Sequence, residues 1–178
     1  SQVNRCNEIL KRLTLNPVEE DEFIDKDINI RDYLSEIISS FKEITKKEFV
    51  FNFDQDSNPK KISKSIEIVY GLRNFIGNAN KFSLNKIFIN LKSNANFTEV
   101  IISDDGSGYP NDILSKIGEP YLKSLKQKDK EKSGLGLGLF IGKTLLEKNF
   151  ATLIFRNSES TGGAEVTIRW KNKDLFNL

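Results

Sequence analysis

Residues 74–83 read NFIGNANKFS and form the most informative stretch of this 178-residue chain. They complete an apolar periodicity over residues 63–82 that predicts a helix, with a serine N-cap and Glu67 in its first turns. Asn74, Asn78 and Lys81 stand at i, i+4 and i+7, so two amides and one ammonium share a face of that helix. The amide oxygens suit Mg²⁺ and the ammonium suits a phosphate, while an ordinary solvated face is the alternative. The opposite face is apolar and is expected in the core: Ile68, Leu72, Phe75, Ile76 and Ala79.

A second motif, residues 103–108, reads SDDGSG and follows a predicted strand. Its glycines let the backbone turn sharply and approach a ligand closely. The carboxylate of Asp104, at the strand end, can accept a hydrogen bond from an exocyclic amine such as that of adenine. A plain turn fits the same residues. A calcium loop is excluded, because Ile113 occupies the region where such a loop needs its last carboxylate.

A third motif, residues 134–139, reads GLGLGL and is expected to form a loop immediately before a helix over residues 140–148. The backbone amides of such a loop and the helix N-terminus favour phosphate oxygens. The motif is not a Walker loop, because the Gly-Lys-Ser/Thr ending is missing, and no strand precedes it as in a Rossmann unit. About 15 irregular, lysine-rich residues come before it, which fits either a functional loop over polyphosphate or a disordered surface loop.

The absence of histidine limits the possible chemistry. Without histidine and with a single cysteine, Cys6, the chain has no His-based triad, no phosphorylated histidine, no structural zinc site and no internal disulfide. The net charge of +2 gives no argument for nucleic-acid binding. No apolar run is long enough to span a bilayer, and no signal peptide is expected. Catalysis is left to Asn, Asp, Glu, Lys, backbone amides and a hard metal ion.

Helix and strand patterns alternate along the chain, which predicts an α/β fold with one mixed sheet and helices on one face. The strand patterns are at residues 28–30, 49–53, 86–91, 99–102, 152–155 and 165–170, and the helical ones at 31–45, 63–82, 111–117 and 139–148. A short helix over residues 3–13 is expected to precede this fold. The domain boundary is expected near residues 15–27, where Asn16-Pro17 and an acidic run interrupt the pattern.

In this order and separation, the three motifs resemble the N box, the Asp-x-Gly-x-Gly box and the second glycine box of the GHKL superfamily of histidine kinases and gyrase-type ATPases. The resemblance covers residues 28–170, and residues 118–121, 134–146 and 162–164 look like the RegB/PrrB/ActS group of redox-responsive sensor kinases. It implies the Bergerat fold, a two-layer α/β sandwich. The implied division is a dimerisation-helix end at 1–15, a linker at 16–27, the ATP-binding catalytic domain at 28–171 and a tail at 172–178.

The resemblance also implies residue roles toward ATP and Mg²⁺. Asp104 would bind the adenine amine, and Gly108 would let the backbone pass close to it. Asn78 would hold Mg²⁺, while Asn74 and Lys81 would contact the phosphates or their waters. Gly136 and Gly138 of the second glycine box would cradle the β- and γ-phosphates, and an ATP lid would span residues 118–133. The implied ATP-binding set is Asn74, Asn78, Lys81, Phe82, Asp104, Gly106, Gly108, Tyr121, Gly134, Leu135, Gly136, Leu137, Gly138 and Leu139, of which Asn74, Asn78 and Lys81 would be catalytic.

One position separates phosphoryl transfer from hydrolysis. Gyrase-like ATPases carry a glutamate base one helical turn before the metal-binding asparagine, whereas this chain has Asn74, which cannot take a proton. The resemblance therefore implies transfer to a histidine supplied elsewhere, because neutral imidazole is nucleophilic without a strong base. A GHKL-type hydrolytic ATPase and an inactive nucleotide-binding module are the alternatives.

The first residues resemble the end of a dimerisation helix whose neighbour carries the acceptor histidine, so this fragment would be inactive without that domain. The implied partners are that domain, a second copy of the full-length protein and the receiver domain of a response regulator, with no nucleic acid. The implied location is cytoplasmic, with a membrane reached only through a parent inner-membrane sensor. In the RegB group a cysteine here is implicated in redox control, so Cys6 is either a redox switch or a small apolar side chain on a helix seam. After the last long helix, where the family commonly has glycine, Asn149 is the residue that tolerates the left-handed cap conformation.

Overall fold

The computed structural model describes residues 28–54, 61–62, 65–117 and 135–175. The predicted helix at 3–13, Cys6, Tyr121, Gly134 and the lid at 118–133 lie outside the described residues. Within those ranges, no helix combines the length and the apolar character needed to cross a bilayer.

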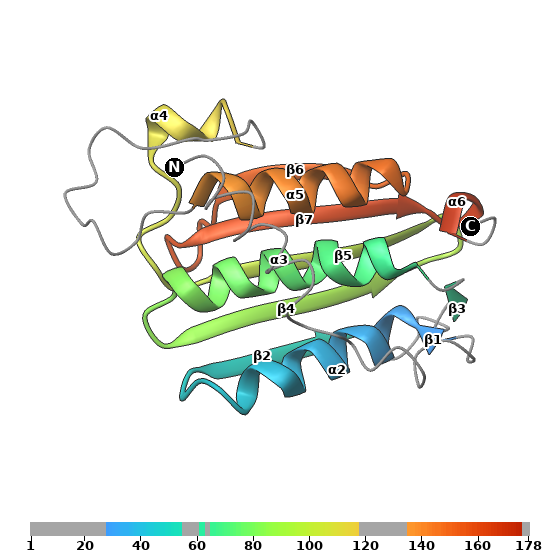
Figure 1. Cartoon of the computed structure of the whole chain (residues 1–178), viewed down its shortest axis with the longest axis horizontal. Helices are drawn as coiled ribbons and strands as arrows, with labels where there is room; N and C mark the ends of the chain where they lie inside the picture. Colours follow the sequence, from blue (N-terminus) through green and yellow to red (C-terminus); the bar gives the residue numbers. More distant parts are fainter. Residues whose placement is uncertain (1–27, 55–60, 63–64, 118–134, 176–178) are drawn as a thin grey trace, which may run out of the picture.

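A five-stranded mixed sheet forms one layer of the described structure (Figure 1). Its strands are, in chain order, β2 (Glu48–Phe53), β4 (Lys86–Ser93), β5 (Phe97–Asp104), β6 (Thr152–Asn157) and β7 (Ala164–Lys171). They lie side by side in the order β2-β4-β5-β7-β6; β2 runs parallel to β4, and the other neighbours are antiparallel. The parallel pair follows from the chain path, because a helical crossover returns the next strand in the same direction. A separate antiparallel ladder joins β1 (Ile28–Asn29) to β3 (Lys61–Ile62).

The second layer consists of helices that cover one face of this sheet (Figure 1). Its long helices are α2 (Ile30–Lys42), α3 (Ile66–Phe82) and α5 (Leu135–Lys148), and the short ones elsewhere are α4 (Asn111–Leu114) and α6 (Asn172–Leu175). The mixed sheet with helices on one face, predicted from the alternation of helix and strand patterns, is therefore confirmed, and so is the two-layer sandwich that the resemblance implies. Residues 172–175, expected in a tail, form α6, and the Asn172 side chain ties it to the β4–β5 turn by donating to the Asn94 carbonyl at 2.7 Å.

Helix α3 supplies the centre of the core. Its apolar face is buried as predicted, with Leu72 and Ile76 completely inaccessible and Phe75 2% exposed. Each such side chain contributes about 1.5–3 kcal/mol of burial free energy relative to exposure. The helix begins at Ile66, three residues later than the periodicity indicates, because Ser65 is its N-cap and accepts the backbone N–H of Ile68 on Oγ.

Helices α3 and α5 pack closely because glycines line their contact. A Cβ built on Gly71 would lie 2.6 Å from Leu146 Cγ, and one on Gly142 would lie 2.9 Å from Phe75 Cε2. These separations are too short for a side chain, so the two backbones approach each other as only glycine allows. The packing brings the first turns of α5 against the C-terminal half of α3.

Two local predictions were wrong. Helix α5 starts at Leu135, so residues 135–139 are helical and do not form a loop before the helix. The left-handed residue after α5 is Phe150, with φ of 66°, and not Asn149. The Asn149 side chain forms hydrogen bonds with the start of α3 instead: its Nδ2 donates to Glu67 Oε2 at 2.7 Å, and its Oδ1 accepts from the Ser65 hydroxyl at 3.1 Å. These contacts hold Asn149 against the N-terminus of α3, so the chain reversal takes place one residue later.

Candidate functional site

A pocket opens between the C-terminal half of α3 and the ends of β5 and β7. Its walls combine apolar and aromatic side chains with few polar groups, which is the usual composition of a small-molecule site. The lining residues are Phe75, Asn78, Ala79, Phe82, Ile102, Asp104, Ser107, Gly108, Tyr109, Pro110, Ala164 and Val166. Asn78 and Phe82 reach the pocket from α3, Asp104 from β5 and Gly108 from the loop after β5, so four of the predicted site residues line the same space.

Asp104 is a buried carboxylate at the last position of β5, with 2% of its surface exposed. Burial raises the pKa of its carboxyl above the ordinary value of 3.8. Two backbone donors oppose that rise: Gly106 N–H lies 2.8 Å from Oδ1, and Ala164 N–H lies 3.4 Å from the same oxygen. Both donors bind Oδ1 and so fix the orientation of the carboxylate. This arrangement suits a carboxylate that accepts a hydrogen bond from a ligand.

Asp105, the next residue, has a structural role. Its Oδ1 accepts the backbone N–H groups of Leu84 at 2.8 Å and Asn85 at 3.0 Å. Desolvation alone would raise the pKa of this carboxyl, but the backbone donors outweigh it and the pKa is lowered. Asp105 therefore holds the α3–β4 turn against the end of β5, which keeps the C-terminus of α3 beside Asp104.

Asn78 and Asn74 meet the first turns of α5. A Cβ built on Gly138 would lie 3.4 Å from both Nδ2 and Oδ1 of Asn78 and 3.7 Å from Oδ1 of Asn74. The Asn74 Nδ2 donates to the Tyr70 carbonyl at 2.8 Å, whereas the buried Nδ2 of Asn78 has no hydrogen-bond partner among the described residues. A buried polar atom without a partner is uncommon and marks Asn78 as a candidate ligand-binding group.

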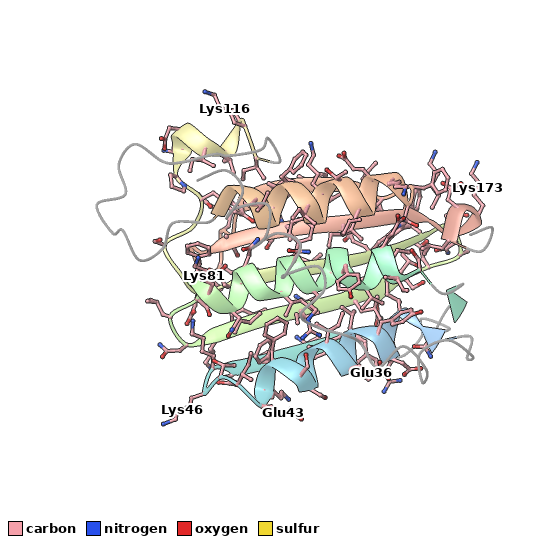
Figure 2. The ribbon with its side chains drawn as sticks, in the orientation of Figure 1. Glu36, Glu43, Lys46, Lys81, Lys116 and Lys173 are labelled. Carbon is pink, nitrogen blue, oxygen red and sulfur yellow. The ribbon has the colours of Figure 1, made fainter. Side chains whose placement is uncertain are left out.

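The end of α3 carries the remaining predicted residues of that helix. Phe82 lines the pocket. Lys81 is exposed at the C-terminal end of α3 (Figure 2). Its Nζ lies 5.4 Å from the Phe82 ring centroid. Lys81 does not line the pocket. A different lysine, Lys47, donates from its Nζ to the carbonyls of Asn80 and Ser83, so it binds the carbonyl end of α3.

Residues 63–174 match the family model described as histidine kinase-, DNA gyrase B- and HSP90-like ATPase. The chain belongs to this ATPase family. The matched residues include α3, all the residues that line the pocket and α5. The match agrees with the family that the three motifs resemble.

Proteins similar to this chain in sequence or in fold are described as sensor histidine kinases. Sensor histidine kinase RegB of Cereibacter sphaeroides is 36% identical over 108 residues, which is 58% of this chain and 23% of that protein. This chain thus spans only a part of the length of that relative. Two solved structures share the fold: the mycobacterial sensor histidine kinase MprB, at 19% identity with a TM-score of 0.68 over 81% of this chain and 96% of the other, and full-length ShkA in complex with AMPPNP, at 20% identity with a TM-score of 0.65 over 82% of this chain and 30% of the other.

Sequence reasoning missed several residues that shape the pocket of this family member. Thr161 Oγ1 donates to the Asp104 carbonyl at 2.7 Å, and Asn157 bonds both backbone groups of Tyr109. Tyr109 itself is 8% exposed and packs edge-on against Phe155, with ring centroids 6.2 Å apart. No local pattern announces these contacts, because they join β6 and the β6–β7 turn to residues about fifty positions earlier. Of the remaining predicted residues, Gly106 lies behind the pocket against the Phe82 carbonyl, and Leu139 is buried in α5.

Proposed function

We propose that this chain is the ATP-binding catalytic part of a sensor histidine kinase, which transfers the γ-phosphate of ATP to a histidine outside this chain. The observation that carries the proposal is that Asp104, a buried hydrogen-bond acceptor, and Asn78, whose Oδ1 is of the kind that ligates Mg²⁺, line one pocket. A nucleotide needs both kinds of group: one for its base and one for its metal-bound phosphates. The ShkA complex with AMPPNP supports a nucleotide as the ligand of this fold.

The base would bind at the Asp104 end. An adenine amine can donate to the carboxylate oxygen that the backbone of Gly106 leaves free. The ring would lie between the apolar side chains of the pocket, with Tyr109 and Pro110 on the loop side and Val166 on the sheet side. Guanine presents a carbonyl at the same position, so the buried carboxylate would reject it.

The phosphates and Mg²⁺ would bind at the Asn78 end. In the described ranges no three His, Cys, Asp or Glu side chains cluster as a metal site. Asn78 could ligate Mg²⁺ only through its Oδ1 and only as one of a few protein ligands, with phosphate oxygens and water completing the coordination, as Mg²⁺ prefers, while its Nδ2 could donate to a phosphate oxygen. Bound there, the ion would neutralise charge on the transferred phosphoryl group. We assign phosphate contacts to Asn74, Lys81 and the second glycine box, and a pocket wall to Tyr121.

Transfer fits the site better than hydrolysis. A carboxylate base for water is missing at position 74, where the amide of Asn74 is held by its bond to the Tyr70 carbonyl. The imidazole of the acceptor histidine would then be the nucleophile, and this chain would position the ATP and neutralise its charge. A hydrolytic ATPase and a nucleotide-binding module without activity are the competing proposals.

The partners follow from this assignment. We propose that residues 1–15 end a dimerisation helix, that residues 16–27 link it to the catalytic domain, and that the acceptor histidine lies on the dimerisation domain. A full-length homodimer would pass the phosphate to a response regulator on the cytoplasmic side of an inner-membrane sensor. We retain Cys6 as a candidate redox switch, which thiol alkylation of the full-length enzyme would test.

The decisive experiment mixes this chain with labelled ATP, Mg²⁺ and a separately purified dimerisation domain that carries the acceptor histidine. We expect acid-labile label on that domain and little free phosphate. Free phosphate without an acceptor would support the hydrolytic ATPase, and tight ATP binding with neither product would support the inactive module. A chain that binds no ATP at all would refute all three.

A further inference from the structure

Asn157, the last residue of β6, binds both the backbone N–H and the backbone carbonyl of Tyr109. Its Oδ1 accepts the Tyr109 N–H at 2.6 Å, and its Nδ2 donates to the Tyr109 carbonyl at 3.0 Å. One side chain thus satisfies both polar groups of a residue that lies in no strand, as a neighbouring strand would. The contact joins segments 48 positions apart in the sequence.

The loop that Asn157 holds has no space to shift toward β6. Gly108 has φ of +77°, and a Cβ there would lie 2.7 Å from Asn157 Oδ1 and 2.8 Å from the Gly162 carbonyl oxygen. The backbone at Gly108 therefore packs directly against Asn157 and the β6–β7 turn, with no room for a side chain. Beyond it, Tyr109 is buried, and burial raises the pKa of its hydroxyl. Residues 108–110 are therefore packed against β6 and the β6–β7 turn, and they are called the pocket wall below.

That wall forms one side of the pocket. Gly108, Tyr109 and Pro110 line it together with Asp104, whereas Asn157 does not. We propose that Asn157 is a positioning residue for the base end of the nucleotide pocket, acting through the backbone of Tyr109. This inference rests on the proposed function, since it concerns how that pocket recognises adenine.

The location predicts which part of the ligand is affected. The wall belongs to the β5–α4 loop, whereas Asn78 and Gly138 belong to α3 and α5 and do not contact Asn157 through any described hydrogen bond. Loss of the two hydrogen bonds from Asn157 to Tyr109 should therefore lower the affinities for adenosine and for Mg-ATP by the same factor. A substitution at the phosphate end would instead change the ratio of the two dissociation constants.

The test measures the dissociation constants of adenosine and Mg-ATP by calorimetry on the full chain, for wild type, Asn157→Ala, Asn157→Asp and the control Asn52→Ala. Asn52 is an exposed asparagine on β2, the opposite edge strand, where its Nδ2 donates to Asn90. We expect Asn157→Ala to weaken both ligands about tenfold, as the loss of two hydrogen bonds allows, with their ratio unchanged. Asn157→Asp keeps the acceptor for the Tyr109 N–H and loses the donor, so it should fall between, and Asn52→Ala should bind as wild type.

Three results would overturn the inference while wild type binds ATP: unchanged affinity in Asn157→Ala, a loss confined to Mg-ATP, or lower thermal stability with wild-type affinity of the folded protein. If Asn157→Ala does not fold, Asn157→Asp decides, and wild-type affinity for adenosine in that variant would overturn the inference as well. A wild-type chain that binds neither ligand would instead refute the proposed function.

Discussion

Gly163 lies directly against the backbone of Asp104: a Cβ atom at position 163 would stand 1.9 Å from the Asp104 carbonyl oxygen and 2.6 Å from its Oδ1. The β6–β7 turn therefore closes over the end of β5 without a side chain between them. Thr161 strengthens the contact by donating from its hydroxyl to the same carbonyl oxygen at 2.7 Å. The position of the Asp104 carboxylate thus depends on a turn nearly sixty residues further along the chain.

We expect Gly163→Ala to destabilise the fold by about 3 kcal/mol, because the new methyl meets backbone that cannot move aside. Gly162→Ala is the matched control in the same turn. Gly162 has φ of +73°, and a methyl group added there would meet none of the described atoms within 4 Å, so its cost is backbone strain alone, about 1 kcal/mol. Urea unfolding of both variants measures the difference, and equal losses would show that the close approach to Asp104 is not a constraint.

Asp104→Asn should make the fold more stable at neutral pH and weaken adenosine binding. Because the folded-state pKa of Asp104 is raised, its charged form costs stability above that pKa, and the cost vanishes as the pH falls below 3.8. The neutral amide avoids this cost, so we expect a gain on the order of 1 kcal/mol, or roughly 2–4 °C in Tm, at pH 7. Thermal melts at several pH values check the prediction, which fails if the gain persists in acid.

The same variant should change which base is bound. An amide can donate to the carbonyl of guanine or hypoxanthine, whereas a carboxylate can only accept. We expect adenosine to bind about tenfold or more weakly to Asp104→Asn and the preference for adenosine over inosine to shrink. Calorimetry with the two nucleosides measures this, and an unchanged preference would mean that Asp104 does not read the base.

Asn78→Ala should remove the metal-dependent part of nucleotide binding. In the proposed binding mode adenosine binds at the Asp104 end and does not contact Asn78, so its affinity should stay within about twofold of wild type, whereas Mg-ATP should bind at least about tenfold more weakly and transfer should stop. Asn80→Ala is the control, because Asn80 lies two residues away on α3 and does not line the pocket. Equal losses for adenosine and Mg-ATP would place Asn78 in the base pocket and remove it from the metal site.

Phe150→Gly should stabilise the chain. Phe150 is 59% exposed and has φ of 66°, a conformation that costs a non-glycine residue about 1 kcal/mol or more. Glycine removes that strain with little loss of buried surface, so we expect a net gain of about 1 kcal/mol in urea unfolding. Phe150→Ala keeps the Cβ and should change stability much less; a gain from alanine as large as that from glycine would assign the effect to the ring and not to the backbone.

The core of α3 and the sheet were predictable because their signals are local. Apolar residues at helical spacing must face one side, so the burial of Leu72, Phe75 and Ile76 follows from the pattern. Alternation marked the strands in the same way. The start of α5 was not predictable on these grounds, since alternating glycines have poor helix propensity. Contact between α5 and α3 at Gly138 and Gly142 outweighs that propensity, and only packing reveals it.

The order of residues along the chain was sufficient to establish the α/β architecture, the polar face of α3 and the motifs of the family, because periodicity and motif spacing are properties of neighbouring residues. Folding alone brought Asn78 and Asp104 to one pocket and placed Asn157 and Gly163 behind it. Those contacts bridge dozens of residues, and their energies come from close packing and hydrogen bonds between segments that have no local pattern in common.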